Sequence, residues 1–487
     1  MLFTSGLFLF VYLPVTLVLF FLIARKAGPG AAAAWLAAMS LAFYGYWVPA
    51  YLALLVGSIL FNFVAGLAIV RHAGTDRARY ILIAAIVVDL LALAFFKYYN
   101  FLTDNVRAAG LPMPVLNVIL PIGISFFTFT QIAYLVDAYK GKAHEPKLVH
   151  YGLFVTYFPH LIAGPILHHS EMMPQFANRD TYRLRLDNFA LGALFLLFGL
   201  MKKVLVADNI SIIADRAFDA ANLGQVGMLH AWEGALAYAL QIYFDFSGYS
   251  DMAVGISLLL NIQLPYNFAS PYRSTSIIEF WRRWHMTLSR FLRDYLYIAL
   301  GGNRKGNVRR YVNLAVTMIL GGLWHGAAWT FVIWGALHGF YLVLNHGWRW
   351  VAQKAGVAGK GGWPMRAVAW ALTMLGVLVA WVFFRATSVH GALFMLKAMA
   401  GGALGTDLLA GSTQHWALLA ALLLFTVALP NSQTVIMERI RPAIARRLAG
   451  GRTGIILASL GIWAMLVVWL ALVAASRENA AFIYFNF

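Results

Sequence analysis

The stretch GGLWHGAAWTFVIWGALHG, residues 321–339, combines a composition suited to hydrocarbon with two histidines. Apart from His325 and His338, it consists of glycine, alanine, aliphatic and aromatic residues and one threonine. Apolar runs of about 20 residues are typical of helices that cross a membrane. Ionisable residues are rare in such helices and are functional by default. The stretch therefore predicts a membrane fold and makes its two histidines candidates for a functional site.

The same composition extends through the whole chain. Of its 487 residues, 61% are hydrophobic and 11% are charged, and the mean hydropathy is +0.72. Soluble domains carry about 25% charged residues, so most of this surface is expected to face hydrocarbon. The apolar runs have helical length, unlike the short alternating segments of a β-barrel. We predict an all-α, polytopic membrane protein of about 10–12 transmembrane helices, with re-entrant and amphipathic helices where glycine and proline interrupt the runs.

The net charge of +18 raises the alternative of a nucleic-acid-binding protein. The basic residues cluster in short gaps between apolar runs, which is the positive-inside pattern of membrane proteins. We therefore expect membrane lipid as a partner and no nucleic acid. The chain has no cysteine, and its histidines lack clustered ligands at metal spacing, so no metal is predicted. Phosphate-loop and serine-hydrolase motifs are missing as well.

The basic gaps also predict a topology. The basic pair 25–26 follows the first apolar run, which places that loop in the cytoplasm and the N-terminus on the far side. Residues 267–310 carry many arginines and are too polar to span, so we expect an amphipathic region at the cytoplasmic face. The last apolar run leaves residues 476–487 as an extracytoplasmic tail. We interpret 1–487 as a single membrane-embedded domain.

Several polar residues interrupt the apolar sequence YFDFSGYSDMAVG (243–255): Asp245, Ser247, Tyr249 and Asp251. A carboxylate at membrane depth is costly unless it has a partner. Taken alone, the pattern favours a structural role, in which the carboxylates bond to neighbouring helices or cap a helix break. The alternative is that these side chains support or line a functional site.

The histidines allow similar alternatives. Small residues beside Trp324 and His325 would let a backbone or ligand approach closely, yet a lone buried histidine is more often a hydrogen-bonded core residue than a catalyst. His338 follows thirteen residues later; on one unbroken helix it would lie on nearly the opposite face, about 20 Å away. His285 lies among arginines in FWRRWHMTLSRF, and taken alone this favours an interfacial histidine.

With these residues in view, the sequence resembles the membrane-bound O-acyltransferase superfamily, in the bacterial branch typified by the alginate O-acetyltransferase membrane subunit. The similarity runs nearly end to end, and its most specific part is FWRRWH followed by WHG. The matching segments are FFKYYNF (95–101), LPIGISFFTF (120–129), FPHLIAGPI (158–166), YFDFSGYSDMAVG (243–255), FWRRWHMTLSRFLRDYLYIALGGNR (280–304), GGLWHGAAWTFVIWGALHG (321–339), WVFFRA (381–386) and FIYFNF (482–487).

The resemblance implies an enzyme of the bacterial inner membrane that moves an acetyl group from cytoplasmic acetyl-CoA to an exported polysaccharide of the alginate or cellulose type. It implies a ring of helices around a central tunnel. The essential family histidine corresponds to His325 and the second to His285, whereas Trp324, His338 and the polar residues of 243–255 would line or support the tunnel. Neutral imidazole suits the reaction, because a hydroxyl attacking a thioester needs a base of pKa near 7.

The C-terminal FIYFNF resembles a motif shared by this branch and by the small membrane partner in teichoic acid D-alanylation, where a tyrosine carries the acyl group as an ester. The resemblance implies that Tyr484 is an acyl carrier. The alternative is an aromatic anchor at the membrane interface.

The resemblance also implies partners: a periplasmic SGNH or esterase-like acetyltransferase, or another polysaccharide-modifying protein, and a polysaccharide synthase complex. Peptidoglycan and teichoic acid are alternative acceptors. A polysaccharide-associated transporter is a rival from another class, because intramembrane aspartate and histidine also relay protons. A non-catalytic scaffold for the synthase is a third interpretation.

Overall fold

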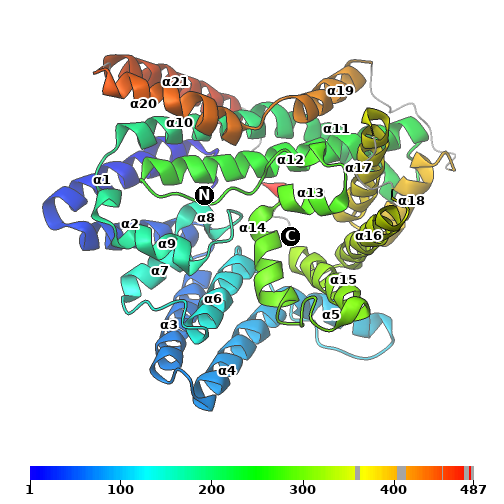
Figure 1. Ribbon diagram of the computed structural model, residues 1–487, viewed down its shortest axis with the longest axis horizontal. Coiled ribbons are helices and arrows are strands. Elements are labelled where there is room, and N and C mark those ends of the chain that lie inside the picture. Colours follow the sequence, from blue (N-terminus) through cyan, green and yellow to red (C-terminus); the bar gives the residue numbers. More distant parts are fainter. Residues whose placement is uncertain (357–361, 403–412, 452, 476–481, 484–487) are drawn as a thin grey trace. The chain divides into compact units, whose positions relative to one another are not determined.

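The computed structural model describes residues 1–356, 362–402, 413–451, 453–475 and 482–483 (Figure 1). Helices form the regular structure of these residues, which confirms the predicted all-α class. Contacts between the elements divide the chain into two compact units. The first unit comprises 1–201, 249–265 and the described residues of 436–486, and the second comprises 202–248 and the described residues of 266–435.

The first unit contains twelve of the α-helices: α1 (Leu13–Ala27), α2 (Pro29–Gly45), α3 (Ala50–Arg71), α4 (Asp76–Leu93), α5 (Tyr99–Ala108), α6 (Ile124–Tyr139), α7 (Leu148–Thr156), α8 (Phe158–Leu161), α9 (His169–Ala177), α10 (Leu186–Leu200), α20 (Arg441–Ala449) and α21 (Thr453–Ala475). In the second unit the helices are α11 (Asp208–Asn222), α13 (Ile277–Arg283), α14 (Met286–Phe291), α15 (Gly306–His325), α16 (Trp329–Lys354), α17 (Trp363–Arg385), α18 (Val389–Met399) and α19 (Thr413–Ala428). Helix α12 (Met228–Leu259) begins in the second unit and ends in the first.

Local sequence explains the connection between α1 and α2. Gly28 has φ of 89°, a left-handed value that glycine adopts without steric cost. Pro29 follows at the first position of α2, where its missing N–H costs no hydrogen bond. Arg25 and Lys26 occupy the last turn of α1, where positive charge interacts favourably with the helix dipole. The two helices then pack against each other.

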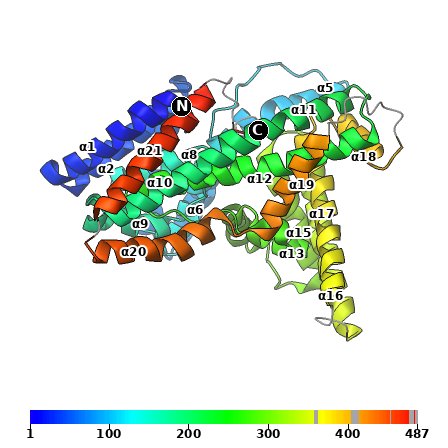
Figure 2. The same cartoon turned by 90° about the horizontal axis from the view of Figure 1, so that it is seen from above.

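Within the first unit, α3, α4 and α6 form one packed group, and α21 lies along α10 (Figures 1 and 2). The segment 151–166, predicted to be interrupted, is broken at Tyr157, whose φ of −47° and ψ of 104° leave the helical region between α7 and α8. The segment 120–137 becomes helical only from Ile124, after Gly123 in a left-handed conformation.

Five helical segments among the described residues are long and apolar enough to cross a membrane: Phe8–Ala27, Ala50–Arg71, Asp76–Ala108, Leu186–Asn222 and Trp363–Arg385. Large apolar side chains are exposed along several of them, including Val64, Leu91 and Leu372, each more than 60% exposed. Such surface is unfavourable in water and suits a lipid environment. The protein is therefore an integral membrane protein, and the total of 10–12 spans stays a prediction.

The second unit places α15, α16 and α17 side by side (Figures 1 and 2). Residues 267–310, expected to be too polar to span, form the short helices α13 and α14 and a π-helical turn at Leu292–Tyr297. Ser276 caps α13 by accepting a hydrogen bond from the backbone N–H of Glu279 at 3.2 Å. This unit carries the candidate active site.

Candidate active site

The stretch 321–339 is not one helix. Helix α15 ends at His325, Gly326 and Ala328 are extended, and α16 begins at Trp329. The geometry expected for an unbroken helix, with the two histidines about 20 Å apart, therefore does not apply. Because the chain turns back, residues that follow the break return to residues that precede it, and α15 packs closely along α16.

Glycines make this close approach between α15 and α16 possible. A Cβ atom at Gly322 would lie 2.2 Å from the carbonyl oxygen of Phe331, and one at Gly335 would lie 2.4 Å from that of Met318. A side chain at either position would therefore force the backbones apart. The glycines of the motif thus bring α16 against the turn of α15 that ends in His325.

His325 lies in an enclosure of aromatic rings and is 4% exposed. Its ring centroid is 4.9 Å from that of Trp324, 5.1 Å from Trp334 and 5.2 Å from Phe384. The ring of His285 lies 6.4 Å away, centroid to centroid. The structure therefore brings together the two histidines that the family resemblance had singled out, although they are forty residues apart in sequence.

His285 lies at the break between α13 and α14, with a φ of 44° that is unfavourable for a residue with a side chain. Its Nδ1 is 3.3 Å from the amide oxygen of Asn267. An amide oxygen can only accept, so Nδ1 carries the proton. Asn267 is itself held by Thr287, whose hydroxyl donates to the same oxygen at 2.6 Å. Burial lowers the pKa of His285 to about 3, so the ring is neutral at physiological pH.

His338 belongs to the same aromatic cluster. Its Nδ1 accepts a hydrogen bond from the indole N–H of Trp281 at 3.2 Å. Its ring lies 4.7 Å from that of Trp334, which also contacts His325. Trp334 therefore lies between the two histidines of the quoted stretch, and His338 packs on this tryptophan, which contacts both.

A cavity of about 550 Å³ opens beside this cluster. Trp281 forms part of its wall, as do the apolar side chains of Met286, Met318 and Leu342. Four arginines also line it: Arg282, Arg290, Arg293 and Arg310. Guanidinium groups bind phosphate oxygens with directed hydrogen bonds. The cavity therefore suits an anionic ligand that also has an apolar part.

The carboxylate of Asp245 on α12 is paired. Its Oδ1 is 2.6 Å from Nζ of Lys203, which also lies 2.7 Å from Oδ1 of Asp208. Lys203 belongs to a π-helical turn, Met201–Ala207, and is almost fully buried. Ser247 is buried two residues further along α12. This geometry favours a structural role for Asp245, the first of the two interpretations of that residue.

Tyr249 and Asp251 are buried in the first unit. Tyr249 stacks on Phe3 at 4.9 Å and meets the ring of Phe482 edge-on at 4.6 Å. The described beginning of the FIYFNF motif is therefore packed, with Phe482 only 1% exposed. Tyr484, the candidate acyl carrier, lies outside the described residues.

Sequence reasoning did not find Asn267, Trp281, Trp334 or Phe384 as parts of the site. Trp281, Trp334 and Phe384 lie within matched segments, but their sequence gives no sign of which rings contact His325 or His338, and Asn267 reaches His285 from outside those segments. The only available signal was the density of aromatic residues around the two motifs. In the part of the chain that the structure describes, no group of three or more histidine and acidic side chains could hold a metal ion.

Comparisons with known proteins agree with this arrangement. The profile of MBOAT, the membrane-bound O-acyltransferase family, matches residues 31–384. The peptidoglycan O-acetyltransferase of Helicobacter pylori is 43% identical over 428 residues, covering 82% of this chain and 80% of that protein. The probable alginate O-acetylase AlgI of Pseudomonas aeruginosa is 43% identical over 406 residues, covering 82% of this chain and 75% of that protein. The teichoic acid D-alanyltransferase of Streptococcus thermophilus is 30% identical over 243 residues, covering 47% of this chain and 57% of that protein.

The family match extends over more than half of the chain and includes both His285 and His325. It confirms the resemblance first drawn from the FWRRWH and WHG motifs. The chain therefore belongs to the membrane-bound O-acyltransferase family, in its alginate O-acetylase-like branch, and is an acyltransferase.

Proposed function

We propose that this enzyme transfers an acetyl group from acetyl-CoA to a hydroxyl of an exported polysaccharide of the alginate or cellulose type. The observation that carries the proposal is His325, enclosed by aromatic rings with His285 beside it. The names of two relatives, a peptidoglycan O-acetyltransferase and a probable alginate O-acetylase, support acetyl as the group and a glycan as the acceptor.

His325 acts as the general base in this proposal. The acceptor hydroxyl gives its proton to the imidazole while its oxygen attacks the thioester carbonyl carbon, so that a C–O bond forms. The C–S bond then breaks, and the proton passes from the imidazole to the departing thiolate, which leaves as CoA thiol. The aromatic enclosure excludes water, which would otherwise compete with the hydroxyl and hydrolyse the thioester.

His285 orients the acceptor. Because its Nδ1 donates to Asn267, the lone pair lies on Nε2, which can accept a hydrogen bond from a polar hydrogen of the bound substrates other than that of the attacking hydroxyl, whose proton goes to His325. The left-handed conformation at His285 and the bond to Asn267 fix this ring before substrate binds. Such prior positioning reduces the entropy cost of the reaction.

The arginine-lined cavity is the donor site in this proposal. The phosphates of acetyl-CoA would contact Arg282, Arg290 and Arg310, while the pantetheine arm lies along the apolar wall. Trp281 lines the cavity and also packs 5.8 Å from Trp334, which contacts His325. The tryptophan pair therefore stands between the proposed phosphate site and the proposed base.

The proposed setting is the bacterial inner membrane. In it, 1–487 is one membrane-embedded domain, 267–310 faces the cytoplasmic acetyl-CoA, and 476–487 is an extracytoplasmic tail. In this setting the attacking hydroxyl is the phenol of Tyr484, which gives its proton to His325 and takes the acetyl group as an aryl ester. Tyr484 then passes the acetyl group to a periplasmic SGNH or esterase-like acetyltransferase that acetylates the glycan, next to a polysaccharide synthase complex. Peptidoglycan and teichoic acid are the alternative acceptors, since two of the relatives are named for them.

His325→Ala tests the proposal. Removing a general base lowers the rate by about 10²–10⁴-fold, so membranes containing this variant should transfer almost no label from acetyl-CoA to glycan. His390→Ala is the matched control, because His390 is an exposed histidine on α18 of the same unit. Normal transfer by a normally inserted His325→Ala protein would refute the assignment of the base. Substrate movement without acetylation in the unsubstituted protein would favour the transporter.

A further inference from the structure

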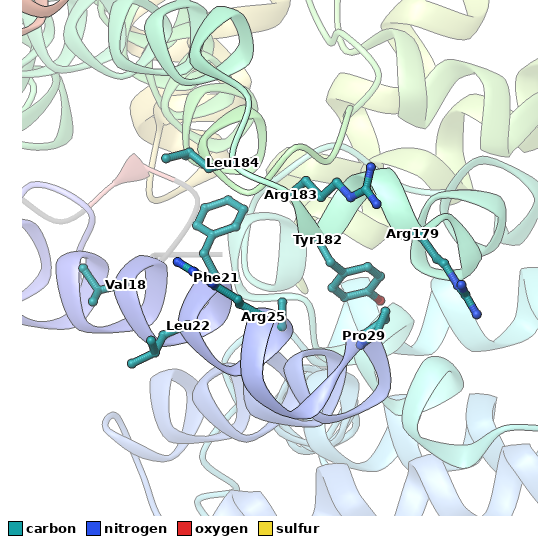
Figure 3. A pocket seen from close by; sticks show the side chains of 10 residues that line it. Val18, Phe21, Leu22, Arg25, Pro29, Arg179, Tyr182, Arg183 and Leu184 are labelled. Carbon is teal, nitrogen blue, oxygen red and sulfur yellow. The ribbon is translucent and has the colours of Figure 1, made fainter.

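A second cavity lies at the end of α1, in the first unit. It has a volume of about 690 Å³ and is lined by residues of α1, by the first residue of α2 and by the 3₁₀ turn Arg179–Tyr182 with the two residues that follow it (Figure 3). Three of the lining residues are arginines: Arg25, Arg179 and Arg183. None of these residues takes part in the acyltransfer chemistry proposed above.

The walls of this cavity are apolar and partly rigid. Phe21 and Leu22 of α1 face it together with Tyr182 (Figure 3). Tyr182 is buried, donates its hydroxyl hydrogen to the carbonyl of Phe176 at 2.7 Å, and packs 5.5 Å from the ring of Phe20. Figure 3 shows the three arginine side chains spread around the cavity, with their ends pointing in different directions. Arginines at the rim of a cavity with apolar walls suit a phosphate that is attached to something hydrophobic.

The charge of the cavity is mainly positive. Asp180 lies beside it, with its carboxylate 3.6 Å from Arg183, but both side chains of this pair are highly exposed. Such an exposed pair is weak, so an incoming phosphate can replace the carboxylate as the partner of Arg183. The three arginines therefore keep a net attraction for an anion.

An exposed apolar stripe leads from the cavity along α1. Val15, Val18 and Leu22 are spaced by three and four residues on α1, which places them on one helix face. Val11 precedes them by four residues in the π-helical turn Phe8–Tyr12, and each of the four is more than 40% exposed. Val18 and Leu22 also line the cavity. A chain lying along this stripe would have its polar end at Arg25, one turn further on.

We propose that this cavity and stripe bind one anionic phospholipid, with its phosphate at the arginine-lined rim of the cavity and an acyl chain along α1. Phosphate chemistry alone would also fit a free phosphate or a nucleotide. The stripe favours the lipid, because α1 belongs to the segment Phe8–Ala27, which is long and apolar enough to cross a membrane. Each basic residue near a membrane surface strengthens the binding of anionic lipid about fivefold, which corresponds to about 1 kcal/mol.

Fluorescence quenching tests the site. The chain has no cysteine, so Val15→Cys accepts a single bimane label on the stripe outside the cavity. Two bilayer preparations of phosphatidylcholine would be compared. One contains a small fraction of phosphatidylglycerol with brominated chains, and the other contains the same fraction of phosphatidylcholine with brominated chains. We expect the brominated phosphatidylglycerol to quench the label at a concentration at least about fivefold lower than the brominated phosphatidylcholine.

Two sets of substitutions separate a site from general surface charge. In the combined variant Arg25→Gln, Arg179→Gln and Arg183→Gln, both brominated lipids should quench the bimane label equally. A control variant removes the same charge from three exposed arginines at the α3–α4 connection, by Arg71→Gln, Arg77→Gln and Arg79→Gln, and should keep the preference. Equal quenching by both lipids in the labelled protein that keeps all three arginines would overturn the proposal, whatever the variants do. So would loss of the preference in the control variant, or its loss when inorganic phosphate is added at constant ionic strength.

Discussion

Replacing Gly335 by alanine should disturb the active site without touching any residue that contacts substrate. Gly335 lies on α16 where that helix meets α15, next to Trp334. The added Cβ would be 2.4 Å from the carbonyl oxygen of Met318 and 2.9 Å from Cα of Ile319. Both are backbone atoms, so no side-chain rotation relieves the contact.

The size of the effect follows from these distances. Ordinary contact begins near 3.4 Å, so α15 and α16 must separate locally by about 1 Å in a close-packed region. Overpacking of this kind costs about 1–3 kcal/mol, and the gain in helix propensity from glycine to alanine offsets about 1 kcal/mol of it. Trp334 would shift relative to His325, and a displacement of about 1 Å in an active site can lower the rate about 10²-fold.

Gly347 provides the matched control, because it is on the same helix and an added Cβ there meets nothing within 4 Å. Two quantities would be measured for each variant: acetyl transfer from labelled acetyl-CoA in membranes, and the thermal stability of the purified protein. Gly335→Ala should lose about 10²-fold in activity, whereas Gly347→Ala should be fully active and slightly more stable. If Gly335→Ala matched Gly347→Ala in both measurements, the close packing of the two helices would not position His325.

Three other substitutions test separate parts of the structure. His285→Ala should lower acetyl transfer strongly, whereas His338→Gln, which keeps a hydrogen-bonding side chain beside Trp281, should lower it less; the reverse order would mean that the site is wrongly assigned. Lys203→Met leaves the buried carboxylate of Asp245 without its cation and should destabilise the protein by about 3–5 kcal/mol in a thermal or denaturant melt, while unchanged stability would argue against the ion pair. Tyr484→Phe should block transfer but keep an aromatic anchor, and mass spectrometry should detect an acetyl group on the C-terminal peptide of the parent only.

The arrangement of the site could be known only from the tertiary structure, whereas the fold class could be predicted from the sequence. Membrane character follows from the hydropathy of successive residues, which is a local property, and the sequence predicted it together with the interrupted segment at Tyr157. The WHG motif identified His325 by resemblance. On one unbroken helix His338 would lie far from His325, and the non-helical residues 326–328 between α15 and α16 removed that condition.

The basic segments show the same difference between what the sequence predicted and what only the tertiary structure decided. The arginine-rich sequence 267–310 predicted a polar, interfacial region; it contains the short helices α13 and α14, and its place at the interface stays a prediction. Its periodicity could not reveal that Arg282 and Arg290 line one cavity with Arg310 of α15. That cavity exists only because α13, α14 and α15 meet, and contacts between separate elements leave no period in the sequence.

The sequence by itself determined that this chain is a helical membrane protein and which histidine to examine first, since both conclusions rest on short stretches of neighbouring residues. Tertiary structure alone decided which groups surround that histidine. Asn267 holds His285, Trp281 bonds to His338, and Trp334 lies between His338 and His325. Apart from the Trp334–His338 contact within α16, each of these contacts joins residues from different elements, and the approach of α15 to α16 depends on how closely glycine lets two backbones come together.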